Sequence, residues 1–185
     1  MKKTLITLVV GLLGILSSFG QGFYAGLEGA RLFGVEKCTN WEIGAFASYS
    51  HKTSSRFGFE AQAGFYTQIY DDAPVEWLGG PVDDRANTFG GKMALCGFVR
   101  VVGPVAILTG PVGSYNFYQK GTSHDFDGPR FDIWINRAEL QWRLGLMADI
   151  QRFRVRVCWD HDLTNRWVDE KLNAITLSVA FRLKP

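Results

Sequence analysis

Hydrophobic and polar residues alternate with a period of two along most of this chain. The clearest segment is residues 56–70, in which Phe57, Phe59 and Phe65 share one face while Glu60 and Gln62 share the other. Because successive side chains of a strand point to opposite sides, this pattern predicts a β-strand with two chemically different faces. Alternation of the same quality predicts further strands over residues 137–150, 153–160 and 175–183.

Four more segments complete an all-β pattern. Residues 41–49 and 91–102 alternate well, whereas residues 23–32 have the composition of a strand with blurred alternation. Residues 105–118 contain Pro111, which lacks the N–H donor that a paired strand uses, so we expect a β-bulge there. The sequence therefore predicts eight strands in one domain.

Long and short connections alternate between these predicted strands. The long ones are residues 34–40, 71–88, 119–132 and 162–173, and the short ones are residues 50–55, 103–104 and 150–151. Transmembrane β-barrels place long loops at the outer end and tight turns at the periplasmic end, with an even number of strands and no open edge. The chain is thus predicted to form an eight-stranded antiparallel up-and-down transmembrane β-barrel.

The first twenty residues have the pattern of a cleaved signal peptide. Lys2 and Lys3 precede an apolar run over residues 4–16, and small residues follow at 17–20. A transmembrane anchor is the alternative, but the run is shorter than the roughly 20 apolar residues that a span needs. We therefore expect residues 1–20 to be removed and residues 21–185 to form the barrel.

Composition removes some classes of function. The net charge of +2 includes Lys2 and Lys3, so the mature chain is formally neutral and has no basic excess for nucleic-acid binding. Among the three cysteines, Cys38 lies in a predicted loop and Cys96 and Cys158 lie in predicted strands. One bridge among three would leave an odd thiol, and we expect no disulfide.

The eight alternating segments, the Gly20-Gln21 junction and the closing strand over residues 175–183 resemble the outer-membrane β-barrel superfamily. The resemblance is to its small porin-like members of Bacteroidetes and to OmpA/OmpX-type barrels. It implies a monomer in the outer membrane of a Gram-negative bacterium, in contact with outer-membrane lipid, with a structural, surface-contact or limited-permeability role. It also implies insertion by the barrel-assembly machinery, which would read Phe181, although the chain ends in Leu183-Lys184-Pro185 without the usual terminal aromatic residue.

Alternation alone does not say which face points outward, and a soluble lipocalin-like barrel would turn its apolar face inward. Glycines beside long polar residues, such as Gly58, Gly64 and Gly145, suit a narrow polar interior. Trp41, Tyr49, Trp142 and Trp159 fall where aromatic girdles would lie. We therefore predict that these apolar residues face lipid: Phe57, Phe59, Phe65, Leu140, Trp142, Leu144, Leu146, Val155, Val157, Trp159, Leu177 and Val179.

The opposite face is predicted to line the interior with a network of charges. Its members are Glu60, Lys92, Arg100, Arg137, Glu139, Arg143, Asp149, Arg154, Arg156, Asp160 and Arg182. A two-residue turn at residues 150–151 would set Asp149 opposite Arg152, Met147 opposite Arg154 and Gly145 opposite Arg156, with Gly145 leaving room for that guanidinium. Since eight strands enclose only enough space for side chains, a salt-bridged plug is favoured over an anion-attracting channel.

Catalytic and metal chemistry have weaker signals. Ser123-His124-Asp125 and His161-Asp162 have residue types that lipid-modifying enzymes use, but adjacent side chains diverge, so we expect no enzyme and no cofactor. His51 lies in a predicted turn, where solvation is expected. The acidic residues of the 71–88 loop have oxygen ligands for a divalent cation, but their spacing matches no calcium-loop motif, and a hydrated acidic surface is expected without a metal. These acidic residues are Asp71, Asp72, Glu76, Asp83 and Asp84.

Overall fold

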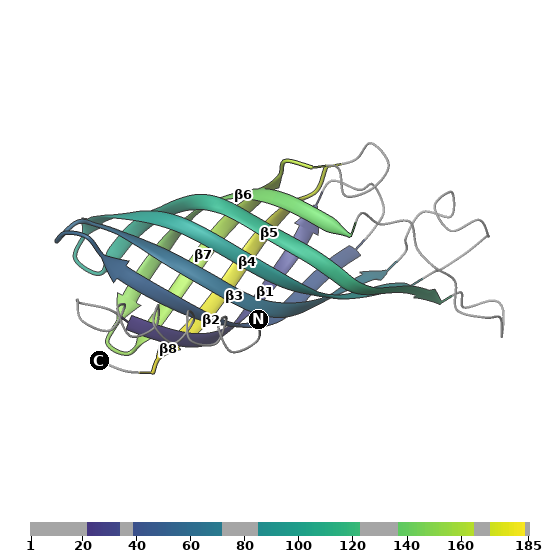
Figure 1. Cartoon of the computed structure of the whole chain (residues 1–185), viewed down its shortest axis with the longest axis horizontal. Helices are drawn as coiled ribbons and strands as arrows, with labels where there is room; N and C mark the ends of the chain where they lie inside the picture. The colour runs from purple at the N-terminus through teal and green to yellow at the C-terminus, as the bar shows by residue number, and fades with distance from the viewer. Residues whose placement is uncertain (1–21, 34–38, 72–84, 123–136, 165–170, 184–185) are drawn as a thin grey trace, which may run out of the picture.

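The protein is a closed antiparallel β-barrel of eight strands (Figure 1). The computed structural model describes residues 22–33, 39–71, 85–122, 137–164 and 171–183. The strands are β1 (Gly22–Phe33), β2 (Thr39–Lys52), β3 (Phe57–Asp71), β4 (Arg85–Val102), β5 (Val105–Thr122), β6 (Ala138–Ile150), β7 (Phe153–Asp162) and β8 (Asn173–Arg182). Each strand pairs with the next, and β8 pairs with β1, which confirms the predicted fold. No helix in the described ranges is long and apolar enough to cross a membrane.

The two ends of the barrel differ. The short connections, residues 53–56, 103–104 and 151–152, lie at one end, which we call the turn end. The longer connections between strands lie at the other, which we call the loop end. The β4–β5 hairpin extends farther at the loop end than its neighbours do (Figure 1). Tyr115 pairs with the first residue of β6, Ala138, and the Asn116 N–H donates to the carbonyl oxygen of Arg137 at 2.7 Å; beyond Asn116, β5 pairs with β4 alone within the described ranges.

The β6–β7 turn differs from the prediction by one position. Its two residues are Gln151 and Arg152, and Gln151 adopts a positive φ of 55°. Tight hairpin turns need such left-handed residues because their twist then matches that of the strands. Asp149 consequently pairs with Arg154 rather than with Arg152, and Gly145 opposes Cys158 rather than Arg156. The shift moves each partner by two residues, so every side chain keeps its predicted face.

The predicted bulge at Pro111 is wrong. Pro111 pairs in register with Trp142 on β6, and the β4–β5 ladder has the same register on both sides of it. The irregularities of that ladder lie between Phe89 and Gly90 and between Arg100 and Val102. A proline is tolerated in the regular ladder because a lost donor requires only a skipped hydrogen bond, not an extra residue.

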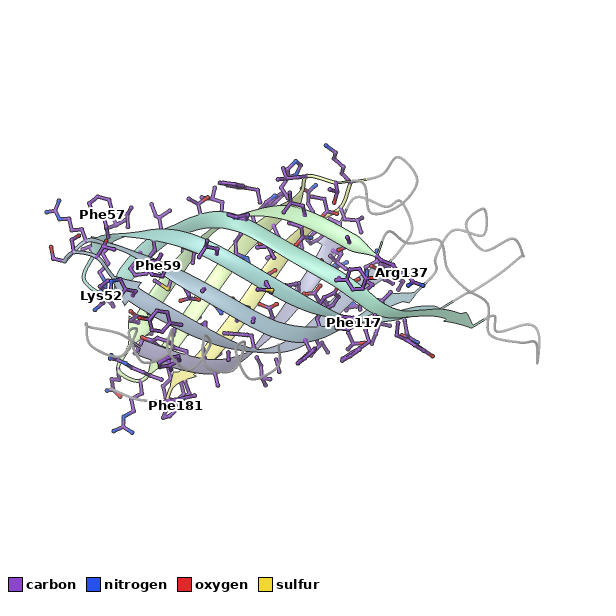
Figure 2. The ribbon with its side chains drawn as sticks, in the orientation of Figure 1. Lys52, Phe57, Phe59, Phe117, Arg137 and Phe181 are labelled. Carbon is purple, nitrogen blue, oxygen red and sulfur yellow. The ribbon has the colours of Figure 1, made fainter. Side chains whose placement is uncertain are left out.

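The apolar face points outward and the polar face inward. Leu144 in the middle of β6 is 56% exposed, whereas its neighbour Arg143 is 1% exposed. Figure 2 shows large side chains such as Phe57, Phe117 and Phe181 on the outside of the ribbon. This arrangement is the reverse of a lipocalin-like barrel, whose apolar side chains would line a central pocket.

Gly110 permits the closest approach of β4 and β5. A Cβ at this position would lie 2.1 Å from the carbonyl oxygen of Leu95, whereas a Cβ at Gly97 on the same pair of strands would meet nothing within 4 Å. We predict that Gly110→Ala lowers the free energy of unfolding by about 2 kcal/mol, because the backbones must separate. Gly97→Ala should change it by less than about 0.5 kcal/mol. Urea titration of the refolded barrel measures both, and equal effects would contradict the packing described.

Candidate functional site

The centre of the barrel interior is held by one carboxylate between two guanidinium groups. Glu60 of β3 forms ion pairs with both Arg154 and Arg156 of β7, across the interior. Arg154 also donates from Nε to Asp149 at 2.7 Å and lies over the Tyr24 ring at 3.9 Å. Buried charges are tolerated when they are paired in this way.

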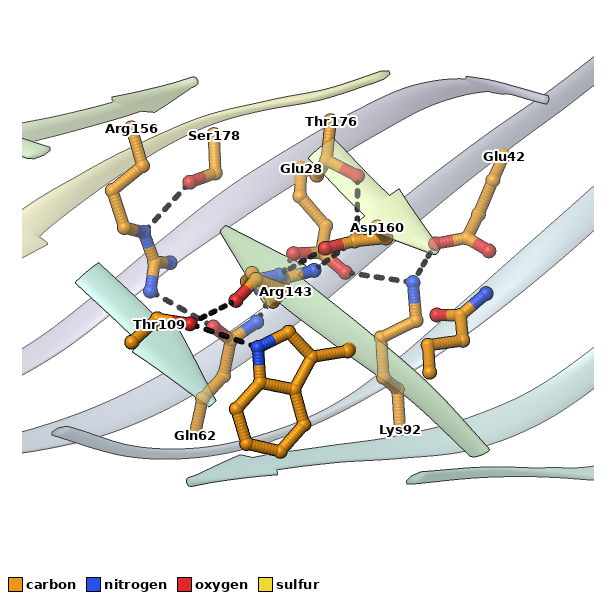
Figure 3. Close-up of polar contacts among 12 residues, drawn as sticks. Glu28, Glu42, Gln62, Lys92, Thr109, Arg143, Arg156, Asp160, Thr176 and Ser178 are labelled. Carbon is orange, nitrogen blue, oxygen red and sulfur yellow. Dashed lines mark hydrogen bonds and ion pairs between the residues drawn. The ribbon is translucent and has the colours of Figure 1, made fainter. Parts of the chain in front are cut away.

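Toward the loop end, the buried cation that neutralises the acids is a lysine and not an arginine. Lys92 of β4 forms ion pairs with Glu28 on β1, at 3.3 Å, and with Glu42 on β2. Gln62 donates to Glu28 at 3.0 Å, and Gln68 donates to Glu42 at 2.8 Å. Figure 3 shows Lys92 between the two carboxylates.

These contacts join into one continuous chain, which we call the interior network. Gln62 accepts a hydrogen bond from Arg156 at 2.9 Å and so connects the lysine layer to the arginine layer. From the loop end to the turn end the network consists of Tyr70, Gln68, Glu42, Lys92, Glu28, Gln62, Arg156, Glu60, Arg154, Asp149 and Arg100. Polar side chains thus contact one another along the whole described length of the barrel.

A second pair stands beside this network. Arg143 donates two hydrogen bonds to Asp160, at 2.6 and 2.7 Å, and Thr176 donates to the same carboxylate at 2.9 Å (Figure 3). The two residues are paired across β6 and β7, so the register itself brings the fork-shaped guanidinium onto the carboxylate. Both side chains are fully buried.

Neutral side chains hold the acids at the loop end. Glu139 accepts hydrogen bonds from Ser114, at 3.0 Å, and from Asn116, at 3.2 Å. Asp162 accepts one from Gln141 at 2.6 Å and one from the backbone N–H of Leu172 at 3.0 Å.

The structure places most of the predicted interior charges inside. Seven are buried: Glu60, Lys92, Glu139, Arg143, Arg154, Arg156 and Asp160. Arg100, Asp149 and Arg182 are half-buried near the turn end. Arg137 departs from the expectation: it lies one residue before β6 begins and its side chain is exposed, although its carbonyl oxygen accepts a hydrogen bond from the Asn116 N–H of β5 at 2.7 Å.

Sequence reasoning missed two acids that the network needs. Glu42 alternates with Trp41 and Ile43, so the pattern of β2 could have placed it inside. Glu28 lies in the segment whose alternation is blurred by small residues. Neither partner could be assigned to Lys92, because a contact across the interior depends on the stagger of the strands.

The remaining interior space is filled by an apolar cluster on the β4–β6 side. It consists of Ala94, Cys96, Phe98, Ala106, Leu108, Val112, Met147 and Cys158. Cys96 and Cys158 are free and buried, and Cys38 lies outside the described residues. A cavity between this cluster and the Glu60–Arg156 pair has a volume of about 10 Å³, room for about one water molecule. The described interior is therefore packed.

All twelve residues predicted to face lipid lie on the outward face. Phe59 and Val155 are half-buried by neighbours, and the other ten are exposed. Aromatic residues gather toward the two ends of this face. The rings of Phe153 and Phe181 meet edge to face at the turn end, with centroids 5.5 Å apart, and those of Phe65 and Phe89 stack nearer the loop end, with centroids 6.0 Å apart.

The candidate catalytic residues do not come together. His161 and Asp162 lie on opposite faces of β7. His161 is exposed, and its Nδ1 lies 2.6 Å from the Oδ1 of Asn173, whereas Asp162 is buried. His51 lies in β2 rather than in a turn, and its ring is 5.2 Å from that of Phe59. Ser123, His124 and Asp125 and residues 72–84 of the acidic loop lie outside the described residues. Within the described ranges, no group of three His, Cys, Asp or Glu side chains could hold a metal ion.

Comparison with known proteins gives matches of structure only. No protein-family model matches the sequence, and no curated protein does. Ail, the attachment invasion locus protein of Yersinia pestis, is similar with a TM-score of 0.53 and 13% identity, over 88% of this chain and 97% of Ail. Neisserial surface protein A has a TM-score of 0.52 and 12% identity, over 89% of this chain and 99% of its own. The chain therefore has the fold of the small eight-stranded outer-membrane β-barrels.

Proposed function

We propose that this protein is an outer-membrane barrel with a closed interior, which acts as a rigid anchor for a surface-contact region at its loop end. One observation carries the proposal: a continuous apolar outer face encloses a packed interior of paired charges. Only lipid favours so much exposed apolar surface on a barrel, and only a membrane requires a sheet without edges.

The closed interior supports contact rather than transport as the main role. Among the described residues, the paired charges and the apolar cluster occupy the middle of the interior and leave a cavity of only about 10 Å³ between them. What can meet a partner is then the loop end, including the extended β4–β5 hairpin. Ail, which has the same fold, is by name an attachment protein and was solved with a heparin analogue, sucrose octasulfate.

The charge of the loop end indicates a different type of partner from a sulfated sugar. Residues 34–38, 72–84, 123–137 and 163–172 together carry ten acidic and five basic residues. A net negative surface repels polyanions and favours cationic partners or partners bridged by cations. We propose a contact role with that charge preference, and no enzymatic activity.

Insertion into lipid can be tested at the middle of β6. We predict that Leu144→Arg lowers the free energy of unfolding in phosphatidylcholine vesicles by about 2–4 kcal/mol, because a guanidinium meets the bilayer midplane. Phe153→Arg at the turn end should cost no more than about 1 kcal/mol. Urea titration in vesicles measures both. In a water-soluble barrel the two exposed sites would tolerate arginine equally.

The closed interior predicts a barrel without conductance. In planar bilayers the purified protein should give no current steps above those of bare lipid. Removing Glu60, Arg154 and Arg156 together, each to Ala, should produce steps, because the central cross-section is emptied without leaving an unpaired charge. Arg31→Ala, on the outer face, is the matched control and should stay silent. Steps from the unaltered protein would show a channel instead.

The predicted orientation places the loop end outside the cell. An epitope inserted within residues 72–84 should bind antibody on intact Gram-negative cells that express the chain, because this connection lies at the loop end. The same epitope within residues 53–56 should bind only after the outer membrane is permeabilised. The reverse result, or labelling of neither on intact cells, would contradict the orientation.

A further inference from the structure

The turn end of the interior gathers cations around one acid. Three basic residues are the last at the turn end among the alternate, inward-facing positions of their strands: Lys52 on β2, Arg100 on β4 and Arg182 on β8. Among the described residues, Asp149 is the acid at this level of the interior. We call this group, with Arg56 and Arg152 in the adjoining turns, the basic mouth.

Backbone pairing brings the segments that carry these cations together. The N–H of Arg100 donates to the carbonyl oxygen of Arg56 at 2.7 Å, and the N–H of Arg182 donates to that of Arg152 at 2.8 Å. Lys52 is within range of the charges of Arg100, Arg182 and Arg154. Figure 2 places Lys52 at this end of the barrel. Arg100 and Arg182 are thus half-buried near Lys52, whereas Arg56 and Arg152 are exposed in the adjoining turns.

The acids nearby are already shared. Asp149 forms ion pairs with Arg100 and with Arg154, at 2.7 Å in each case. Glu60, nearer the centre of the interior, forms ion pairs with Arg154 and Arg156. The Nε of Arg100 is shielded from solvent and has no hydrogen-bond partner among the described residues. A desolvated guanidinium N–H without an acceptor is costly, so this opening suits an added anion.

We propose that the basic mouth binds an oxyanion of the phosphate class through Arg100, Arg182 and Lys52. Guanidinium groups offer parallel N–H donors that match the oxygens of a phosphate, and lysine adds a mobile charge. The ligand is either free phosphate or the headgroup of an anionic phospholipid, which share this chemistry. The site depends on the turn end of the barrel and does not require the proposed membrane location.

The test uses the whole barrel refolded in uncharged maltoside micelles. Sodium phosphate is titrated at constant ionic strength against sodium chloride while the arginine Nε–Hε signals are followed by NMR. We expect saturable shifts at Arg100 and Arg182 with phosphate and not with chloride. Lys52→Gln with Arg100→Gln should weaken binding at least tenfold, whereas Arg31→Gln, an exposed arginine on the outer face, should leave it unchanged.

Lys52→Gln alone keeps the test informative if the double variant fails to fold. Lys52 is exposed and outside the interior network, so its loss should preserve the barrel and weaken phosphate binding two- to threefold. Shifts that do not saturate, or that chloride reproduces, would overturn the proposal, as would equal affinity in Lys52→Gln and the unaltered protein.

A second arm identifies the source of the phosphate. The barrel is placed in nanodiscs of phosphatidylcholine alone or with phosphatidylglycerol, and the phosphate titration is repeated. Weaker binding of phosphate in the presence of phosphatidylglycerol shows that the headgroup occupies the mouth, and unchanged binding assigns the site to free phosphate. Either result supports the site, and loss of phosphate binding in both nanodiscs contradicts it.

Discussion

An eight-stranded barrel leaves so little space inside that every inward side chain must be packed and every inward charge must be neutralised. The strands of this chain direct charged residues inward and apolar residues outward, so the fold depends on charge pairing across the interior. Glu60 illustrates the constraint, since it serves two arginines from the opposite wall. Removing one member of such a group leaves a buried charge alone, which costs more than the pair contributes. The interior network is therefore a condition of closure, and it is the basis for the proposal of a closed interior.

The sequence predicted the features that depend on a period of two and on the length of connections. Alternation located the eight strands and assigned the two faces, as Leu144 and Arg143 show, and the alternating connection lengths predicted the closed barrel. It misplaced the β6–β7 turn because only the left-handed conformation of Gln151 distinguishes the two possible turns. It could not pair Lys92 with Glu28, because that contact is fixed by strand stagger and not by neighbours along the chain. Local patterns thus predict the fold, whereas contacts across the interior can be assigned only from the three-dimensional structure.

The interior is not uniform around its circumference. The interior network draws residues from β1, β2, β3, β4, β6 and β7, whereas the larger apolar cluster consists mainly of residues from β4, β5 and β6. Close backbone approach occurs on both sides, at Gly110 beside the carbonyl of Leu95 and at Gly64 beside that of Ala45. Charge pairing therefore extends farther around the interior than apolar packing does. The effect of a substitution should be judged by whether the side chain belongs to the network or to the apolar cluster.

The distribution of charge along the axis follows from the connections. The tight turns and the strand ends beside them carry one acid, Asp149, and six basic residues, whereas the longer connections are rich in acids; the basic residues are Lys52, Arg56, Arg100, Arg152, Arg154 and Arg182. Backbone pairing fixes the main chain at this end, as the bond from the Arg100 N–H to the Arg56 carbonyl shows. A fixed main chain suits a small ligand of defined geometry, because no loop has to be ordered on binding. Longer connections suit larger partners, since loops on a rigid scaffold commonly carry binding functions. The two proposals thus assign different kinds of recognition to the two ends of the barrel, a small anion to the turn end and a larger partner to the loop end.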